Sequence, residues 1–550
     1  MKCYLVLIIS FLFFTKAAFA NNPSDQCLVH LDKSFYVTGE VIWFKIYLPT
    51  SSKGNPFTLR VALLDKQGEL ADYFFLKTEG KSYAYGYYKI PFNRESGVYQ
   101  LAFLGQEKTS KRPVILAKVP VPIYNDLEKL NNIPVAASVL DIESHNKLIA
   151  SNLHIEISLN QNTYKNRAKI EPVITVKDQS GQPVRANVSV AVTDIAITGK
   201  ALPGQSTVST GFPLFSTALN DNIYTQTKLS GSSAGTQKEN LIGIYDPLEW
   251  QMFYASPDEE GVFFIEMPHF YGEKSIQFLG YPNPNIQVQL NEVLQANYSP
   301  TIVYTEEILK YLELSRQRKK IFQLYTTLET SLVPELSDNA LEPLPPDRSI
   351  LLSNYENFED LATFFREISS PLAFTLDRKK NLYTARMYNP GIQTYYPNDP
   401  MFIVDGQVTR NADFVARLKP TEVDRVDLYY NFDKLFSNFL VIGSSGAISI
   451  TTKSGVRIPD PEAEDIITIH GLLPPAKFPE FKPEQIGNNQ HQPFFRPQLY
   501  WNPTLETDAK GEASFSFVQS DDISTFRIEV VVQAEGGAIG QATKEYIVNW

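Results

Sequence analysis

The chain has 550 residues, more than the roughly 250–300 that one hydrophobic core accommodates, so about three or four domains are expected. Hydrophobic residues make up 43% of the chain and aromatic residues 12%, which excludes global disorder and favours strands. The formal net charge of −11 disfavours a nucleic-acid partner, because phosphate backbones would be repelled.

The first twenty residues have the pattern of an export signal. Lys2 precedes an apolar run over 4–14, and Ala18-Phe19-Ala20 supplies small residues for cleavage after position 20. No later run reaches the roughly 20 apolar residues that span a bilayer, so we expect an exported chain that is soluble or peripherally held. Cys27 would then be the only cysteine, which excludes an internal disulfide and predicts a passive residue.

Two long segments near the N-terminus are expected to form antiparallel β-sandwiches. Residues 24–125 contain apolar and aromatic runs such as 41–47, separated by Gly, Ser, Asn and Asp. The second segment covers 150–300 and begins with the alternating run 154–159, as expected of a half-buried strand.

The two segments open with similar sequences, which indicates a duplicated module. LDKSFYVTGEVI over 31–42 resembles LNQNTYKNRAKI over 159–170. Gly39 of the first copy corresponds to Arg167 of the second. This difference predicts that the turn does not require a left-handed glycine in both copies.

An Asp-x-x-Gly pattern between strand-like runs predicts four hairpin turns. Asp can bond its own backbone two residues on, and Gly accepts the positive φ that closes such turns. Calcium binding is not expected, because the dense acidic pattern of a calcium loop is missing. The four turns are Asp65 to Gly68, Asp178 to Gly181, Asp258 to Gly261 and Asp508 to Gly511.

The segment 201–241 within the second unit is rich in Ser, Thr, Gly, Asn and Gln and is expected to be an extended surface loop. Residues 301–345 are expected to be a helical connector and a Pro-rich linker, with a helix over 305–328 capped by Thr305. A basic cluster on this helix is expected to be a solvated face. It consists of Arg316, Arg318, Lys319 and Lys320.

The remaining segments differ in character. Residues 346–456 combine a helix near 358–368 with strand-like runs and predict a small α+β domain. Residues 457–495 are Pro-rich and are expected to be a second linker, followed by a separate β segment over 496–550.

Three stretches resemble the macroglobulin-type β-sandwich domains of bacterial envelope proteins. They are the opening 31–40 with Trp43, the run 178–192, and 496–503 with the Asp-x-x-Gly turn and strand that follow. The resemblance implies macroglobulin-like sandwiches over 24–125 and 150–300 and in the C-terminal segment.

A second resemblance lies between these stretches. FIVDG over 402–406, EVDRV over 422–426 and GSSGAISITTKSG over 443–455 resemble, in order, the plug domain of TonB-dependent outer-membrane receptors. The combination resembles the macroglobulin-plus-plug envelope proteins of the Bacteroidetes group. It implies a mainly β, multi-domain chain with one plug-like α+β domain, located in the periplasm, at the outer membrane or on the cell surface.

Two departures limit what these resemblances imply. Only 95 residues follow the plug-like unit, whereas a receptor barrel of about 22 strands needs several hundred. The chain is therefore not expected to be a transporter. The Cys-x-Glu-Gln thioester of covalent macroglobulin inhibitors is absent, because Cys27 is followed by Leu-Val-His.

Catalytic and metal-binding patterns are absent from the sequence, so neither an enzyme nor a cofactor is expected. The six His are scattered without His-Glu-x-x-His spacing, and no Gly-x-Ser-x-Gly or phosphate-binding loop occurs. Aromatic stretches offer a binding face as an alternative to ordinary sheet packing. The candidate binding residues are Tyr83, Tyr85, Tyr87, Tyr88, Asp405 and Gly406.

The first hypothesis is therefore a non-enzymatic cell-envelope protein that binds a protein or polymer partner, with the plug-like unit as a docking element. One alternative is a macroglobulin-like protease inhibitor without a thioester, for which 201–241 is the only candidate cleavage segment. Another alternative is a carbohydrate-active enzyme, which would need two carboxylates about 5 to 10 Å apart in a cleft.

Overall fold

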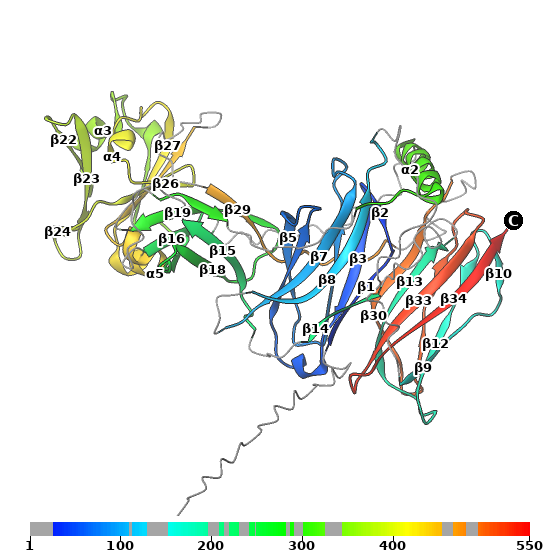
Figure 1. Cartoon of the computed structure of the whole chain (residues 1–550). Coiled ribbons are helices and arrows are strands. Elements are labelled where there is room, and N and C mark those ends of the chain that lie inside the picture. Colours follow the sequence, from blue (N-terminus) through cyan, green and yellow to red (C-terminus); the bar gives the residue numbers. More distant parts are fainter. Residues whose placement is uncertain are drawn as a thin grey trace, which may run out of the picture.

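The computed structural model of the chain describes residues 26–108, 113–128, 152–195, 208–213, 219–229, 241–247, 249–281, 286–290, 301–324, 344–453, 466–479 and 493–550. The expected signal segment 1–20 lies outside them. The described residues form an elongated row of four units (Figure 1). Three are β-sandwiches and one is a small α+β unit, so the predicted mainly β, multi-domain fold is confirmed.

Sandwich 1 is built from the N-terminal segment and one later strand over 208–213, which the expected unit over 24–125 does not include. Its two sheets enclose one core of aliphatic and aromatic side chains. One sheet has the order β2 (Tyr36–Val37), β8 (Pro113–Tyr124), β7 (Gly97–Gln106), β4 (Thr58–Leu64) and β5 (Leu70–Lys77). The other has the order β14 (Val208–Pro213), β1 (Gln26–Leu31), β3 (Val41–Tyr47) and β6 (Tyr83–Lys89).

Sandwich 2 combines two segments that are about 300 residues apart in the chain, unlike the expected continuous unit over 150–300. One sheet has the order β10 (Thr163–Lys165), β34 (Ile539–Asn549), β33 (Thr525–Ala534), β13 (Ala186–Asp194) and β30 (Gln498–Glu506). The other contains β31 (Glu512–Ser514), β12 (Val173–Asp178) and β9 (Leu153–Ser158), beside the pair β11 (Lys169–Ile170) and β32 (Phe517–Val518). The C-terminal β segment is therefore half of a sandwich rather than a separate element.

Sandwich 3 lies between sandwich 1 and the α+β unit (Figure 1). One sheet has the order β18 (Val262–Met267), β15 (Ile223–Leu229) and β20 (Val288–Leu290). The other has the order β17 (Gln251–Ala255), β16 (Leu241–Asp246), β19 (Glu273–Tyr281) and β29 (Ile466–His470). The core of sandwich 3 continues onto the outer face of sandwich 1, because Tyr73 and Phe75 of β5 belong to it.

Two segments that were expected to lack regular structure contribute strands to the sandwiches. Residues 201–241 were expected to be a surface loop, but their described parts include β14, which pairs with β1, and β15. The Pro-rich segment 457–495 was expected to be a linker, but it contributes β29 to sandwich 3. The polar composition of the first segment and the Pro-rich composition of the second gave no indication of strands. The partners of these strands lie elsewhere in the sequence.

The α+β unit contains a five-stranded mixed sheet, which includes the strand-like runs expected within 346–456. The sheet order is β21 (Arg348–Leu351), β27 (Val423–Tyr429), β28 (Ala447–Thr452), β25 (Met401–Val404) and β26 (Gln407–Thr409). A smaller sheet and three short helices surround it: β22 (Leu372–Asp377), β23 (Leu382–Asn389), β24 (Thr394–Tyr395), α3 (Leu361–Glu367), α4 (Ala412–Ala416) and α5 (Phe432–Gly443).

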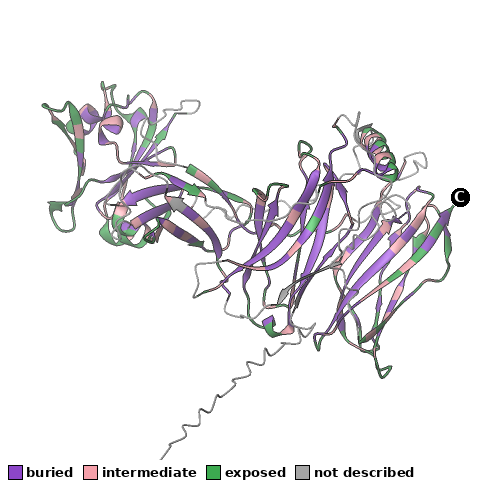
Figure 2. Cartoon of the chain, in the orientation of Figure 1, coloured by how far each residue is buried: buried purple, intermediate pink, exposed green. Residues whose placement is uncertain are grey.

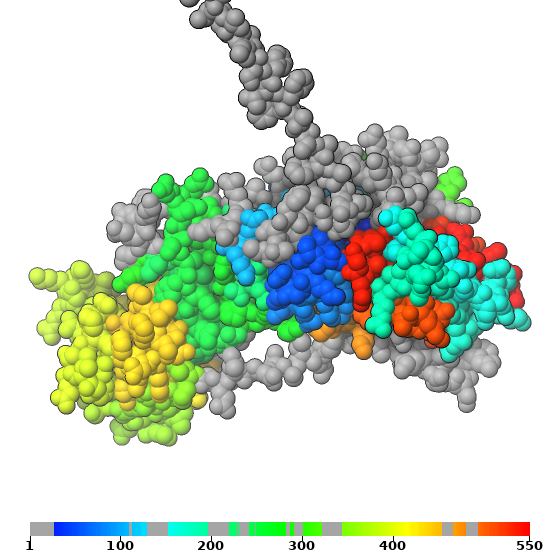
Figure 3. Space-filling view, turned by 90° about the horizontal axis from the view of Figure 1, so that it is seen from below, coloured from blue at the N-terminus to red at the C-terminus, as the bar shows by residue number. Residues whose placement is uncertain are grey.

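Buried residues lie along the strands of all four units (Figure 2). The space-filling view shows the α+β unit at one end, followed by sandwich 3, sandwich 1 and sandwich 2 (Figure 3). None of the described helices is long and apolar enough to cross a membrane. Cys27 lies in the core of sandwich 1, where burial raises the pKa of its thiol to about 12.

Helix α2 (Glu306–Leu324) joins sandwiches 1 and 2 and corrects the expected solvated basic face. Thr305 caps it as predicted, since its hydroxyl accepts from the backbone N–H of Ile308 at 3.3 Å. The Nζ of Lys319 lies 2.8 Å from the buried carboxylate of Asp126 in sandwich 1. Arg318 pairs with Asp522 of sandwich 2 at 2.5 Å, and both side chains are about nine-tenths buried.

All four Asp-x-x-Gly segments are turns of one geometry, but only Asp65 to Gly68 joins two paired strands, β4 and β5. The other three turns connect strands of different sheets, so the hairpin prediction is confirmed for the first turn alone. In each of the four turns, the Gly has a φ between 73° and 85°, and its N–H donates to the Asp carbonyl. The Asp carboxylate accepts from the N–H groups two and four residues further on. The backbone therefore accounts for these carboxylates at Asp65, Asp178, Asp258 and Asp508.

The duplicated module is visible in sandwiches 1 and 2. Strand β2 pairs in parallel with β8, and β10 pairs in parallel with β34. The hydroxyl of Tyr36 donates to Asp32 at 2.6 Å, and that of Tyr164 donates to Asn160. The two openings thus form the same local turn.

The turn is left-handed in both copies, although only the first copy has the glycine that such a conformation favours. Gly39 has a φ of 84° and Arg167 a φ of 57°. The Nε and one Nη of Arg167 contact the two carboxylate oxygens of Asp521 at 2.6 and 2.7 Å. A bidentate ion pair therefore offsets the backbone strain that glycine avoids in the first copy.

Substitutions at Arg167 test this compensation. Arg167→Ala keeps the strain and loses the ion pair, so we expect it to destabilise sandwich 2 by about 2 kcal/mol. Arg167→Gly loses the same ion pair but removes the strain, so its cost should be about 1 kcal/mol smaller. Urea unfolding, monitored by hydrogen exchange of the amides in sandwich 2, measures the destabilisation caused by each substitution. Equal destabilisation by the two substitutions would contradict the explanation.

Candidate functional site

The tyrosines of β6 divide between the two faces of their strand. Tyr83, Tyr85 and Tyr87 share one face, and Tyr88 points into the core of sandwich 1, where its ring stacks on Phe74 with a centroid separation of 6.3 Å. Tyr85 is exposed, whereas Tyr87 is buried against Trp43 with centroids 5.4 Å apart. The predicted aromatic surface is therefore not continuous.

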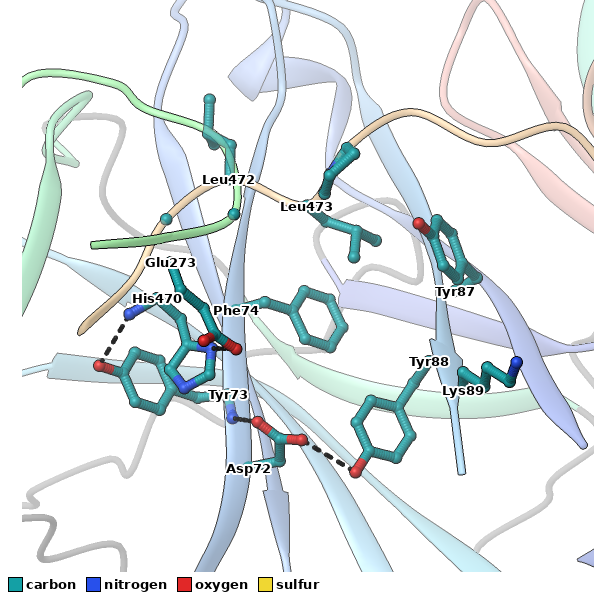
Figure 4. Close-up of a pocket in the computed structure, with 13 residues that line it drawn as sticks. Asp72, Tyr73, Phe74, Tyr87, Tyr88, Lys89, Glu273, His470, Leu472 and Leu473 are labelled. Carbon is teal, nitrogen blue, oxygen red and sulfur yellow. Dashed lines mark hydrogen bonds and ion pairs between the residues drawn. The ribbon is translucent and has the colours of Figure 1, made fainter. Parts of the chain in front are cut away.

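Tyr87 and Tyr88 nevertheless line a pocket of about 230 Å³ between sandwiches 1 and 3 (Figure 4). Three segments that are distant in the sequence supply its walls: β5 and β6, the turn at 272–273, and the segment 470–474. Most of the wall is apolar or aromatic and comes from Phe74, Tyr87, Tyr88, Leu472, Leu473 and Pro474.

The segment 471–473 is held beside β5 by backbone hydrogen bonds. The N–H of Phe75 donates to the carbonyl of Gly471 at 3.0 Å, and the N–H of Leu473 donates to the carbonyl of Phe75 at 2.8 Å. A side chain at Gly471 would bring a Cβ within 2.4 Å of the Phe270 carbonyl oxygen. Glycine is therefore required for this close approach, which places Leu472 and Leu473 in the pocket wall.

Polar groups gather at one side of the pocket. Asp72 accepts from the hydroxyl of Tyr88 at 3.0 Å and from the N–H of Tyr73 at 2.8 Å. The carboxylate of Glu273 lies 3.5 Å from Nδ1 of His470. In Figure 4 the ammonium of Lys89 points away from Asp72 and Glu273, on the far side of Tyr88.

The arrangement favours binding over proton transfer. Burial, followed by the charge of Asp72, raises the pKa of Tyr88, so its phenol stays protonated and donates to that carboxylate. The pocket contains no Ser or Cys nucleophile. Over the described part of the chain, no group of three His, Cys, Asp or Glu residues could hold a metal ion.

Asp405 and Gly406 form a tight turn rather than part of the pocket. Their φ values are 48° and 83°, and they join the antiparallel strands β25 and β26. The carboxylate of Asp405 accepts from the N–H and hydroxyl of Thr452 at 2.9 and 2.7 Å. Both residues are thus explained by the hairpin, in agreement with the tight turn that an Asp-Gly pair favours.

A second polar cluster lies between sandwiches 1 and 2. Nδ1 of His30 is 2.6 Å from Oγ of Ser189, and the hydroxyl of Tyr47 is 2.7 Å from the same oxygen. Nζ of Lys45 donates to Asn187 and to the carbonyl of Pro503. A Ser–His pair can indicate a nucleophile, but His30, Ser189 and Tyr47 are fully buried, so no substrate reaches it.

Sequence reasoning identified two pocket residues and missed the others. The aromatic run over 83–88 drew attention to Tyr87 and Tyr88. Asp72 and His470 lie nearly 400 residues apart in the chain, and Glu273 lies between them. The three residues share no motif. Leu472 and Leu473 lie in a Pro-rich stretch, and no local signal distinguishes them from linker residues.

No protein-family model and no curated protein matches the chain. Among solved structures, native Escherichia coli alpha-2-macroglobulin is 9% identical, with 96% of this chain and 40% of that chain covered, at a TM-score of 0.23. The Salmonella alpha-2-macroglobulin reacted with methylamine is 8% identical, with 95% and 39% covered, at a TM-score of 0.23. The chain spans about two fifths of their length, and a TM-score this low carries no argument about function.

Proposed function

We propose that this protein is a non-catalytic binding protein of the bacterial cell envelope that docks a partner polypeptide in the pocket between sandwiches 1 and 3. The observation that carries this proposal is the pocket itself, whose aromatic and aliphatic walls adjoin a small polar side. Recognition sites commonly combine such walls with a few placed polar groups. Periplasmic or surface location rests on the expected export signal and on the resemblance to envelope proteins.

Packing between the units favours a rigid row of units. The hydroxyl of Tyr224 in sandwich 3 donates to the carbonyl of Leu104 in sandwich 1 at 3.0 Å. On the α+β side, the amide of Gln277 exchanges two 2.7 Å hydrogen bonds with the backbone of Val408. Together with the α2 ion pairs, these contacts connect every unit to its neighbour.

The α+β unit is proposed as a second contact with the same envelope protein. Along α5, Phe432 and Phe436 stack with centroids 5.6 Å apart, and both are about half exposed. Leu440 on the same helix has a φ of 47° and interrupts it. The hydroxyl of Tyr254 in sandwich 3 accepts from the N–H of Ile442, so sandwich 3 supports this kinked helix. Exposed apolar patches of this kind commonly mark interaction sites.

The two alternative functions have less support. The described parts of 201–241, the segment that the protease-inhibitor alternative needs for cleavage, include the paired strands β14 and β15. Asp72 and Glu273 are the two carboxylates that line the pocket. A general acid near neutral pH is normally held in an apolar environment, whereas the side chain of Glu273 is 65% exposed. The pocket therefore fits ligand binding better.

Photocrosslinking from the pocket tests the proposal. A photoreactive amino acid is placed at Lys89, which lines the pocket, and in a control variant at Lys66, an exposed lysine of sandwich 1 outside it. We expect one envelope protein to crosslink from position 89 and not from position 66. A third variant at Phe436 tests the α+β contact.

The outcomes separate the two contacts. Identical products from positions 89 and 66, or none from position 89, would rule out docking at the pocket. If position 436 gives no product while position 89 does, the α+β unit is removed from the proposal and the pocket remains.

A further inference from the structure

We infer that the pocket receives a cationic side chain, lysine or arginine, from an extended segment of the partner polypeptide. This inference rests on the proposed function and names the chemistry that the site recognises. It follows from the size of the pocket, the character of its walls, the charges at its polar side and the strand edge beside it.

The size of the pocket fits one long side chain. Its volume of about 230 Å³ is below the roughly 300–1,000 Å³ typical of sites that enclose a drug-sized ligand. The walls contributed by Phe74, Tyr87 and Leu473 suit an aliphatic stem, because lysine and arginine bury their methylene groups along apolar surfaces. A neutral aliphatic side chain would satisfy the walls equally well, so the charges must decide between the two.

The charges favour a cation. Two carboxylates, Asp72 and Glu273, line the pocket, and Lys89 is its only lysine or arginine. The ammonium of Lys89 is exposed and is directed away from both carboxylates in Figure 4. Arg94 contacts the hydroxyl of Tyr88 at 2.9 Å but does not line the pocket. A cation entering between the carboxylates would also lie near aromatic rings, whose faces attract positive charge.

The neighbouring strand explains why the ligand is a polypeptide. Strand β6 is the last strand of its sheet, so one of its edges has no strand partner among the described residues. Such an edge can pair with an added extended segment, whose side chains then enter pockets beside the strand. Tyr87 and Tyr88 place the pocket directly beside β6, so a segment added there would present a side chain to it.

Two blocked peptides test the inference on the full-length chain. One is acetyl-Thr-Val-Lys-Val-Thr-amide, and the other has norleucine in place of lysine, which keeps the stem and removes the charge. Calorimetric titration should show about tenfold tighter binding of the lysine peptide. In Asp72→Asn and Glu273→Gln this preference should fall to about twofold or less. Glu95→Gln, which removes an exposed carboxylate outside the pocket, should keep the full preference.

The outcomes distinguish this inference from the proposed function. Equal affinity for both peptides, or binding of neither, overturns the cationic ligand. If a partner still crosslinks from position 89 in that case, docking at the pocket stands and only the ligand chemistry is wrong. A preference for lysine that survives both carboxylate substitutions would also overturn the inference.

Discussion

Removal of residues 493–550 is expected to abolish sandwich 2 completely, including the part formed by residues 153–194. The sheet that contains β13 would lose β30, β33 and β34 and would keep only β10 and β13, which do not pair with each other. A folded domain of this size typically has a stability of about 5–15 kcal/mol, and all of it should be lost. Hydrogen exchange over 153–194 in the truncated chain measures this directly.

A matched deletion provides the control for this prediction. Residues 348–452 form the α+β unit and contribute no strand to sandwich 2. Replacing them by a flexible Gly-Ser linker should therefore leave the exchange protection of 153–194 unchanged. Persistent protection of 153–194 after removal of 493–550 would show that the N-terminal half folds alone, contrary to the observed strand pairing.

Two buried groups should give sandwich 1 opposing responses to acid. Burial, together with the charge of Lys45, lowers the pKa of His30 to about 3. Because unfolded His30 binds a proton near pH 6.5, stability should fall by about 1.4 kcal/mol per pH unit as the pH drops below that value. Burial raises the pKa of Asp32 to about 7, although Lys33 and Tyr36 oppose this shift. Its contribution should therefore grow as the pH falls from about 7 towards about 4.

Single substitutions separate the two responses. In the unmodified chain the contributions of His30 and Asp32 should nearly cancel between about pH 6.5 and 4. Asp32→Asn removes the acid-stabilising group, so acidification from about pH 6.5 to 5 should destabilise sandwich 1 by about 2 kcal/mol. His30→Asn should give stabilisation of similar size over the same interval. Urea unfolding at each pH checks both, and matching pH profiles for the two variants would refute the assignment.

Local chemistry explains which parts of the fold were predictable. The four Asp-x-x-Gly turns depend on residues within the turn itself, and each turn was recognised, although three of them join strands of different sheets. The alternating run 154–159 was also recognised as a strand, β9, but the sheet of β9 and β12 is completed by β31, about 350 residues further on. Their pairing depends on tertiary contacts that alternation in one segment does not specify. The sequence therefore indicated the strands of sandwich 2 without indicating how its two halves combine.

The left-handed turn at Arg167 shows a different limit. Glycine is the usual residue at positive φ, so an arginine at this position gives no sign of a left-handed conformation. The compensating partner, Asp521, is more than 350 residues away and carries no signal that links it to Arg167. The pocket has the same character, since the aromatic run suggested Tyr87 and Tyr88 while Glu273 and His470 join only after folding.

Affinity for the crosslinked partner tests the role of the pocket most directly. Tyr87 and Tyr85 lie on the same face of β6, but only Tyr87 lines the pocket. After hydrogen exchange has shown that both variants are folded, Tyr87→Ala should weaken binding of the partner about tenfold or more, and Tyr85→Ala about twofold or less. Equal affinities of the two variants would contradict docking at this pocket.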